Sequence, residues 1–232
     1  MATRSSLYLH EEILLLALKD KKGTFASASY ETALGGAILA ELLLQKRIGI
    51  EESRKEKLVK RLSAKRTGDP VLDEALKKVG DAKRRASLKT WVRWFSGIKR
   101  VKHRVAEGLC RRGVLRADEG KVLLIFTRKL YPEVDPGPER EIIERLRRAI
   151  FTETKEVEPH TVVLLSLARS ADLLKIVFDR KKLKSRKKRI EKIVNGEIIG
   201  KATKEAVQAV QAAVMVAVIM PAIMASTIST RC

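Results

Sequence analysis

The residues of this sequence that most resemble a catalytic motif lie near position 200, where two glycines and a lysine are spaced almost as in a phosphate-binding loop. The segment begins at Gly196 and ends with Gly200, Lys201 and Ala202. A phosphate-binding loop has four residues between its glycines and a Ser or Thr after the lysine to hold magnesium. Here the spacing is one residue short and alanine replaces the hydroxyl residue. We therefore exclude a nucleotide-binding loop.

The other titratable residues form no catalytic arrangement either. The histidines His10, His103 and His160 are far apart, and none has the spacing to cysteines or carboxylates that a metal site uses. Asp73 and Glu74 begin a predicted helix, where acids stabilise the helix dipole, so a general acid and base pair is not needed to explain them. No G-x-S-x-G, H-E-x-x-H or G-x-G-x-x-G pattern is present. We expect no enzyme activity, no cofactor and no metal.

The charge of the chain predicts a polyanionic partner. Lys and Arg number 49 against 28 Asp and Glu, which gives a formal net charge of +21. Such an excess attracts nucleic acid, anionic lipid headgroups or an acidic protein. The densest basic run, Arg180 to Lys192, contains nine basic residues in thirteen and one acid. It is either a solvated helix or part of a membrane-facing surface.

Cysteine usage and apolar runs indicate the compartment. Cys110 and Cys232 make no disulfide framework, and no long apolar run precedes position 11, so we expect a cytosolic protein without a secretion signal. Residues 206–230 are uncharged but contain two glutamines and a proline. We expect a buried apolar helix at about 203–225, with a membrane span as the alternative.

Apolar periodicity predicts a mainly helical single domain over residues 1–232. The expected helices cover 7–18, 30–45, 71–79, one or two helices within 91–113, then 139–151, 160–178 and most of the remainder. A polar turn followed by a β-rich run predicts a hairpin over 118–129. The pair Gly35-Gly36 inside the second helix would be costly unless another backbone or a ligand approaches it closely. Trp91 and Trp94, three apart, are typical of a core rather than of a ligand platform.

Several ordered segments together resemble the Golgi phosphoprotein 3 (GPP34) family. The first is a Leu-rich helix with paired glutamates, and the others include a Gly-Gly helix, a Thr-Gly-Asp-Pro turn and a Gly-Val-Leu segment. They occur in family order at 7–20, 34–42, 67–77, 104–109, 113–115 and 164–174. The resemblance implies a mainly α fold, a single compact helical domain with a protruding β-hairpin.

The resemblance also implies a function. Family members are peripheral membrane proteins that bind phosphatidylinositol 4-phosphate on the cytosolic face of the Golgi. In eukaryotes they are adaptors that retain glycosyltransferases by their cytosolic tails. The expectation for this chain is therefore a lipid-binding peripheral membrane protein of the cytoplasm, with anionic membrane lipids and the tails of membrane proteins as partners.

Only part of the family's headgroup pocket has matching residues in this sequence. Its two basic residues before the Gly-Val-Leu segment correspond to Lys99 and Lys102, expected one helical turn apart on one face with Arg104 nearby. Several donors suit the acceptor oxygens of a phosphate monoester. The family's pocket tryptophan and arginine correspond to Ala26 and Gly35, so the resemblance supports anionic-lipid binding more firmly than selectivity for the 4-phosphate.

The expected hairpin matches the family element that assists membrane insertion and self-association. Its apolar residues are Val122, Leu123, Leu124, Ile125 and Phe126. Flanking cations could meet headgroups while these side chains enter the interface. The alternative is an ordinary hairpin packed on its own core.

Two other functions compete with lipid binding. A basic helix over 99–112 followed by a hairpin resembles a winged helix, so nucleic-acid binding is the main alternative. It is less favoured because a DNA-contacting wing should be polar, whereas residues 122–126 are apolar. The other competitor is a scaffold that forms homo-oligomers through the hairpin or the apolar C-terminus.

Overall fold

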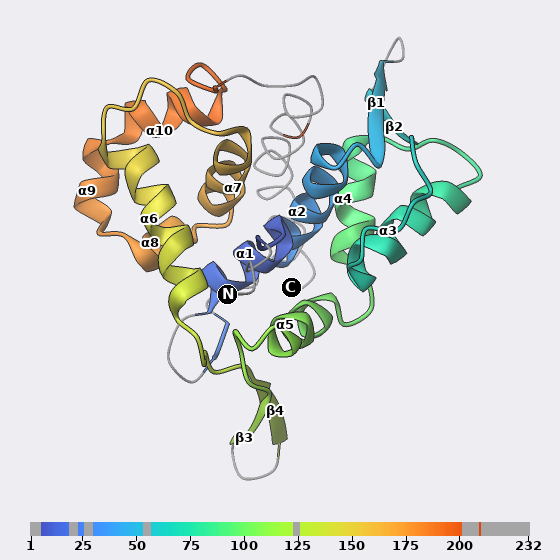
Figure 1. The fold of residues 1–232 in the computed structure, drawn as a ribbon, viewed down its shortest axis with the longest axis horizontal. Coiled ribbons are helices and arrows are strands. Elements are labelled where there is room, and N and C mark those ends of the chain that lie inside the picture. Colours follow the sequence, from blue (N-terminus) through green and yellow to red (C-terminus); the bar gives the residue numbers. More distant parts are fainter. Residues whose placement is uncertain are drawn as a thin grey trace, which may run out of the picture.

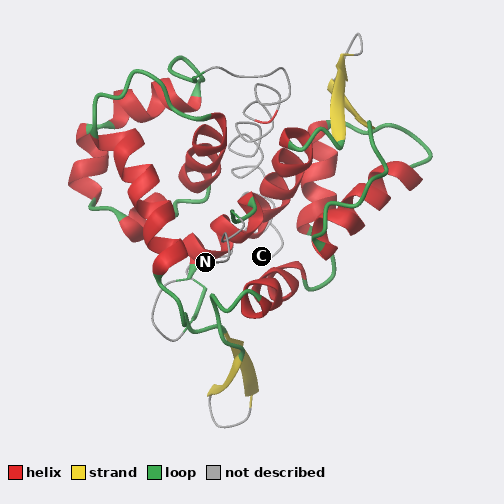
Figure 2. Ribbon diagram, viewed as in Figure 1, coloured by secondary structure: helices red, strands yellow, loops and turns green. Residues whose placement is uncertain are grey.

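The computed structural model describes residues 6–18, 23–25, 30–52, 57–122, 126–200 and 209. These residues form ten helices and two antiparallel hairpins (Figures 1 and 2). The helices are α1 (Leu9–Ala17), α2 (Tyr30–Leu44), α3 (Pro70–Asp81), α4 (Leu88–Ser96), α5 (Val101–Arg111), α6 (Gly137–Phe151), α7 (Pro159–Ser170), α8 (Leu174–Val177), α9 (Arg180–Ser185) and α10 (Lys187–Val194). The hairpins pair β1 (Ile48–Glu52) with β2 (Lys57–Arg61) and β3 (Asp118–Val122) with β4 (Phe126–Leu130).

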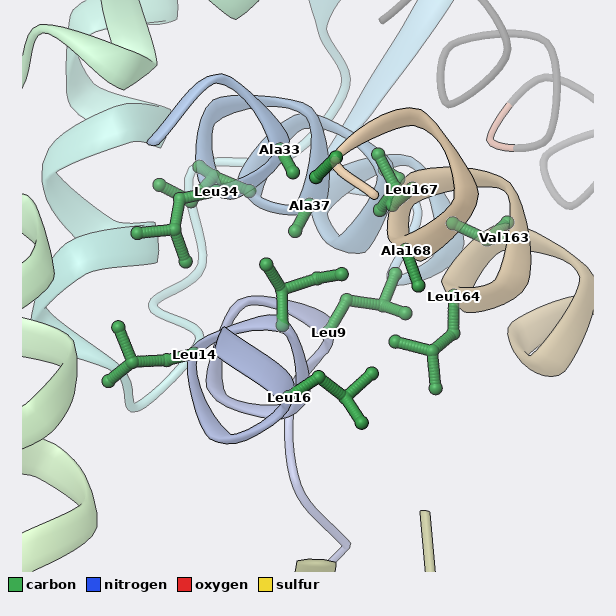
Figure 3. Packing of buried hydrophobic residues seen from close by; sticks show 14 of the residues in the cluster. Leu9, Leu14, Leu16, Ala33, Leu34, Ala37, Val163, Leu164, Leu167 and Ala168 are labelled. Carbon is green, nitrogen blue, oxygen red and sulfur yellow. The ribbon is translucent and has the colours of Figure 1, made fainter. Parts of the chain in front are cut away.

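Helices α1 and α2 form the centre of the molecule. Every residue of α1 is buried, because its apolar side chains pack against α2 on one side and α7 on another. Figure 3 shows this contact, with side chains of the three helices converging on one cluster. Glu41 of α2 accepts a 2.9 Å hydrogen bond from the backbone N–H of Leu9, which joins the first turn of α1 to α2. A buried helix start needs such an acceptor, since its first N–H groups have no partner within the helix.

The remaining elements lie on two sides of this centre. In Figure 1 α6 to α10 lie on one side, α3 to α5 with the β1–β2 hairpin lie on the other, and β3–β4 projects away from the helices. The predicted fold class, a single compact helical domain with a protruding β-hairpin, is confirmed. No helix of the described residues has the length and apolarity that a membrane crossing requires. The expected apolar C-terminal helix lies outside the described residues, apart from position 209.

Close packing of α2 against α4 explains why Gly35 lies inside a helix. A Cβ atom at Gly35 would lie 2.2 Å from Ser96 Oγ and 2.4 Å from the carbonyl oxygen of Val92, both on α4. Helices α2 and α4 therefore approach so closely that only glycine fits. The cost of glycine in a helix is offset by this packing.

The Thr-Gly-Asp-Pro turn starts α3 as predicted. Asp69 is the N-cap, and its side chain accepts hydrogen bonds from the backbone N–H groups of Val71 at 2.9 Å and Leu72 at 2.8 Å. Pro70 occupies the first helical turn, where its missing N–H costs nothing. Gly68 before the cap has φ of +90°, a conformation that favours glycine.

Two parts of the fold differ from the sequence prediction. The helix expected over 160–178 ends at Ser170, because Asp172 takes a left-handed φ of 59° and a turn separates α7 from α8. Aspartate tolerates this conformation better than most residues. The β1–β2 hairpin was not predicted, since its strands carry many charges and bury few residues, among them Ile48 and Val59.

Candidate functional site

The cations expected around a lipid headgroup come from the turn after α4 and the first turn of α5. Lys99 lies in the turn that joins the two helices, and its side chain is exposed. Arg100, the next residue, has a left-handed φ of 55° and is the N-cap of α5. Lys99 is therefore not on the helix that carries Lys102 and Arg104, and the expectation of one helical turn between Lys99 and Lys102 is wrong in this respect.

Lys102 and Arg104 already have acidic partners. Lys102 Nζ lies 2.9 Å from Glu31 Oε1 at the start of α2. Arg104 pairs with Glu74 of α3 and donates to the carbonyl oxygen of Pro70 at 3.2 Å. These contacts join α5 to two other helices, so a phosphate could bind either cation only by displacing or sharing its carboxylate. Among the described residues, Lys99 is the member of the predicted set without an ionic partner.

Of the two positions that correspond to the family's pocket tryptophan and arginine, the structure describes Gly35. Ala26 lies outside the described residues. Gly35 faces α4 so closely that the backbone of Val92 occupies the space a side chain would need. A cation at position 35 is therefore incompatible with this α2–α4 contact.

The exposed side of α4 carries cations and an aromatic ring. We call Lys89, Arg93, Trp94 and Lys99 the α4 surface. Lys89 and Arg93 are four apart and therefore adjacent on the helix. Trp94 is 47% exposed, whereas its neighbour Trp91 is 1% exposed and meets it edge-on at 4.8 Å between ring centroids. The prediction of a core role is confirmed for Trp91 and wrong for Trp94. Within the described part of the chain, the three cations make no ion pair.

The β3–β4 hairpin is held at its base by α5. His103 Nδ1 lies 2.9 Å from the hydroxyl of the buried Tyr131, which follows β4. Burial raises the pKa of Tyr131 to about 12, and burial together with Lys102 lowers the pKa of His103. Both groups are therefore neutral near pH 7, and the hydrogen bond between them is one between uncharged groups.

The apolar end of this hairpin stays a prediction. Leu123, Leu124 and Ile125 lie outside the described residues. The backbones of Val122 and Phe126 are paired across the hairpin.

A buried ionic network joins α1 to α5 and α6. The side chains of Glu11 and Glu12 are each 3% exposed. Glu11 Oε2 accepts from Arg112 Nη1, and Glu12 Oε1 accepts from Arg145 Nη2, both at 2.6 Å. No local sequence pattern indicates these pairs, because the partners of the two acids lie 101 and 133 residues away.

The protonation states of this network are unusual. Burial raises the pKa of Glu12 to about 7, against the opposing effect of the Arg145 guanidinium. Burial lowers the pKa of His160 to about 4, and Arg145 adds to this effect. His160 Nδ1 lies 3.6 Å from Glu12 Oε2, which has no hydrogen-bond partner among the described residues. At 3.6 Å the imidazole is too far to donate a hydrogen bond, so one oxygen of a buried carboxyl has no donor among the described residues.

Glu12 lines a cleft of about 520 Å³. The other charged residues of its lining are the cations Arg112 and Arg145 and the acids Asp135, Glu141 and Glu158. With four acids and two cations, its lining has the opposite sign to the whole chain. Such a cleft favours a cationic group.

The basic run over 180–192 has a structural part and an exposed part. Arg186 pairs with Glu153 at 2.6 Å. Arg189 donates to the carbonyl oxygens of Ala149 at 2.8 Å and Thr154 at 2.9 Å. These two arginines hold α9 and α10 against the end of α6. The lysines of the run are exposed.

Fold and surfaces together define a class: a helical protein with a projecting hairpin and several basic surfaces. The model of the Golgi phosphoprotein 3 (GPP34) family matches residues 9–210, and the chain belongs to this family. It is similar to Vacuolar protein sorting-associated protein 74 of Schizosaccharomyces pombe, with 30% identity over 172 residues. This match covers 66% of the chain and 50% of that protein, so the chain spans about half the length of this relative. Membership in this family supports association of the chain with the Golgi.

Proposed function

We propose that this chain is a peripheral, non-enzymatic protein on the cytosolic face of a Golgi membrane, where it binds anionic lipid headgroups, phosphatidylinositol 4-phosphate among them. The observation that carries the proposal is the α4 surface, where α4 and the turn after it carry three exposed cations without ion pairs to described residues, together with the exposed ring of Trp94. Family membership gives the proposal its cellular setting.

The α4 surface has the chemistry of a membrane contact. Tryptophan favours the boundary between lipid and water because its ring is apolar and its N–H is polar. Each Lys or Arg near an acidic bilayer contributes about 1 kcal/mol of attraction. In a bound state Lys99 would meet a phosphate directly, and Lys102 would reach it by leaving Glu31.

Sedimentation with vesicles tests the proposal. The vesicles contain phosphatidylcholine alone, or with phosphatidylinositol 4-phosphate or phosphatidylserine at equal charge. Removing two cations with Arg93→Gln and Lys99→Gln should weaken binding about thirtyfold, since about 2 kcal/mol is lost. A matched control, Lys65→Gln with Lys155→Gln, removes two exposed lysines from other loops and should bind like the wild type.

The outcomes separate the competing functions. Equal binding of the wild type, the α4-surface variant and the control to acidic vesicles would remove the α4 surface from the proposal. Nanomolar, salt-sensitive DNA binding without vesicle binding would favour the nucleic-acid alternative. Preference for phosphatidylinositol 4-phosphate over phosphatidylserine would support headgroup selectivity.

A second candidate function, that of an adaptor for the cytosolic tails of membrane proteins, is favoured by the acid-lined cleft. A tail with Lys or Arg complements Glu141 and Glu158, two exposed acids of its lining. Fluorescence anisotropy with a labelled basic peptide should show weaker binding for Glu141→Gln with Glu158→Gln. The control, Glu144→Gln with Glu156→Gln, changes exposed acids outside the cleft and should bind as the wild type does.

The hairpin is the proposed element for insertion or self-association. Deletion of residues 118–129 should reduce vesicle binding if the hairpin inserts, and should shift the size-exclusion profile to a smaller species if it joins two copies. If the deletion changes neither measurement while the protein stays folded, the hairpin has neither role.

A further inference from the structure

A second cleft lies between the end of α7 with the following turn and α8 on one side and α9 and α10 on the other. Its volume is about 380 Å³. It is separate from the α4 surface, since in Figure 1 α4 and α5 lie on the opposite side of α1 and α2 from these helices. None of its lining residues belongs to the headgroup site or to the acid-lined cleft described above.

The apolar part of this cleft comes from three side chains: Leu174 of α8, Leu183 of α9 and Ile190 of α10. Leu174 and Ile190 are buried, and Leu183 is half-buried. Apolar lining inside a concave site favours an apolar ligand group, because contact removes apolar surface from water.

The polar part of the lining is strongly cationic. Five cations line the cleft together with one acid, Asp172; the cations are Arg169, Lys175, Arg180, Lys184 and Lys187. Lys175 pairs with Asp172 at 2.6 Å, and Arg169 contacts Glu191 at 3.5 Å. Arg180 and Lys184 make no ion pair with any described residue, so their charge is available to a ligand.

We propose that this cleft binds one molecule of an anionic phospholipid, with a phosphate among the cations and part of an acyl chain on the three apolar side chains. The inference goes beyond the proposed function, because it places a second lipid site away from the α4 surface. Arg180 and Lys184 are four apart on α9 and Lys187 begins α10, and all three side chains line the same cleft.

The size of the cleft favours a lipid over a protein partner. A volume of about 380 Å³ falls in the usual range for small-molecule sites, whereas a stable protein interface buries about 800 Å² on each partner. A ligand of this size that satisfies both cations and apolar side chains must itself be amphiphilic. Phospholipids with acidic headgroups have this chemistry and are available to a protein of a Golgi-associated family.

Isothermal titration calorimetry of the full chain with dihexanoylphosphatidic acid, kept below its micelle concentration, tests the proposal. Two further titrants separate the parts of the ligand: glycerol phosphate lacks the acyl chains, and dihexanoylphosphatidylcholine lacks the net charge. A Glu- and Leu-rich synthetic peptide represents an acidic protein partner. We expect saturable binding of the phosphatidic acid and weaker binding of the other three.

The decisive variant is Lys184→Glu with Lys187→Glu, which reverses two charges in the cleft. Its matched control, Lys181→Glu with Lys188→Glu, makes the same changes three positions from Lys184 on α9 and one position from Lys187 on α10, at exposed lysines outside the lining. Loss of two charged contacts should weaken phosphatidic acid binding at least tenfold in the first variant and leave the control near the wild type. Leu183→Gln should weaken phosphatidic acid binding and leave glycerol phosphate binding unchanged.

Three results would overturn the inference. Equal loss in the two charge-reversal variants would mean diffuse attraction by the basic run, and tighter binding of the peptide would mean a protein site. Loss of binding in the α4-surface variant alone would place the lipid there. If the α4-surface variant instead binds acidic vesicles as the wild type does, and the cleft variants behave as expected, the α4 proposal is refuted and the cleft site is retained.

Discussion

The pH dependence of folding stability should change when Glu12→Gln is introduced. Burial raises the pKa of Glu12 from 4.5 to about 7, so between these values the folded protein binds a proton that the unfolded chain has released. Stability then falls as pH rises through this window, by about 3 kcal/mol for this displacement. Glutamine cannot titrate, so the variant should lack this fall.

His160 should produce the opposite slope. Its pKa is lowered from 6.5 to about 4, so between these values the unfolded chain binds the extra proton and stability rises with pH. The ring is 31% exposed, so solvent screening makes this effect smaller than that of Glu12. In the wild type the two contributions oppose each other between about pH 4.5 and 6.5.

Urea unfolding at half-unit steps from pH 4.5 to 8 measures these slopes. As pH rises from 4.5 to 7, the free energy of unfolding of Glu12→Gln should increase by about 3 kcal/mol relative to that of the wild type. As pH rises from 4.5 to 6.5, the free energy of unfolding of His160→Gln should decrease relative to that of the wild type. Glu144→Gln, which changes an exposed carboxyl on α6, serves as the control. Parallel pH profiles for the wild type and Glu12→Gln would refute the reasoning, because Glu12 would then titrate alike in both states.

Three further changes test contacts that position the sites, each by thermal or urea unfolding. Gly35→Ala should destabilise by about 2 kcal/mol, because its Cβ would overlap the Val92 carbonyl oxygen, and no loss would mean that α2 and α4 are further apart. Asp69→Ala should cost about 1 kcal/mol through the lost N-cap, and Asp69→Asn should recover most of it. Tyr131→Phe should cost about 1 kcal/mol, unless its hydrogen bond with His103 is replaced by water.

Local sequence signals predicted much of the helical fold. The helix predicted over 30–45 matches α2 closely, and the turn at residues 67–70 begins α3. These successes have one cause: helix periodicity, caps and turns depend on residues a few positions apart. The break at Asp172 was missed because a single left-handed aspartate inside an apolar, helix-like run gives only a weak signal.

The candidate sites depended on contacts that no local pattern contains. Lys99 and Lys102 look equivalent in the sequence, but packing places Lys102 beside Glu31, 71 residues away, and leaves Lys99 exposed. Trp91 and Trp94 likewise differ only in which side of α4 faces the core.

The sequence by itself therefore determined the helical class, the family resemblance and the net charge of +21, since these follow from composition and from residues close together along the chain. Only the tertiary structure decided which cations are neutralised, which acids are buried and where clefts form. Glu12 illustrates the reason, because the pKa of its carboxyl depends on burial by several helices and on Arg145, which lies 133 residues away in the chain.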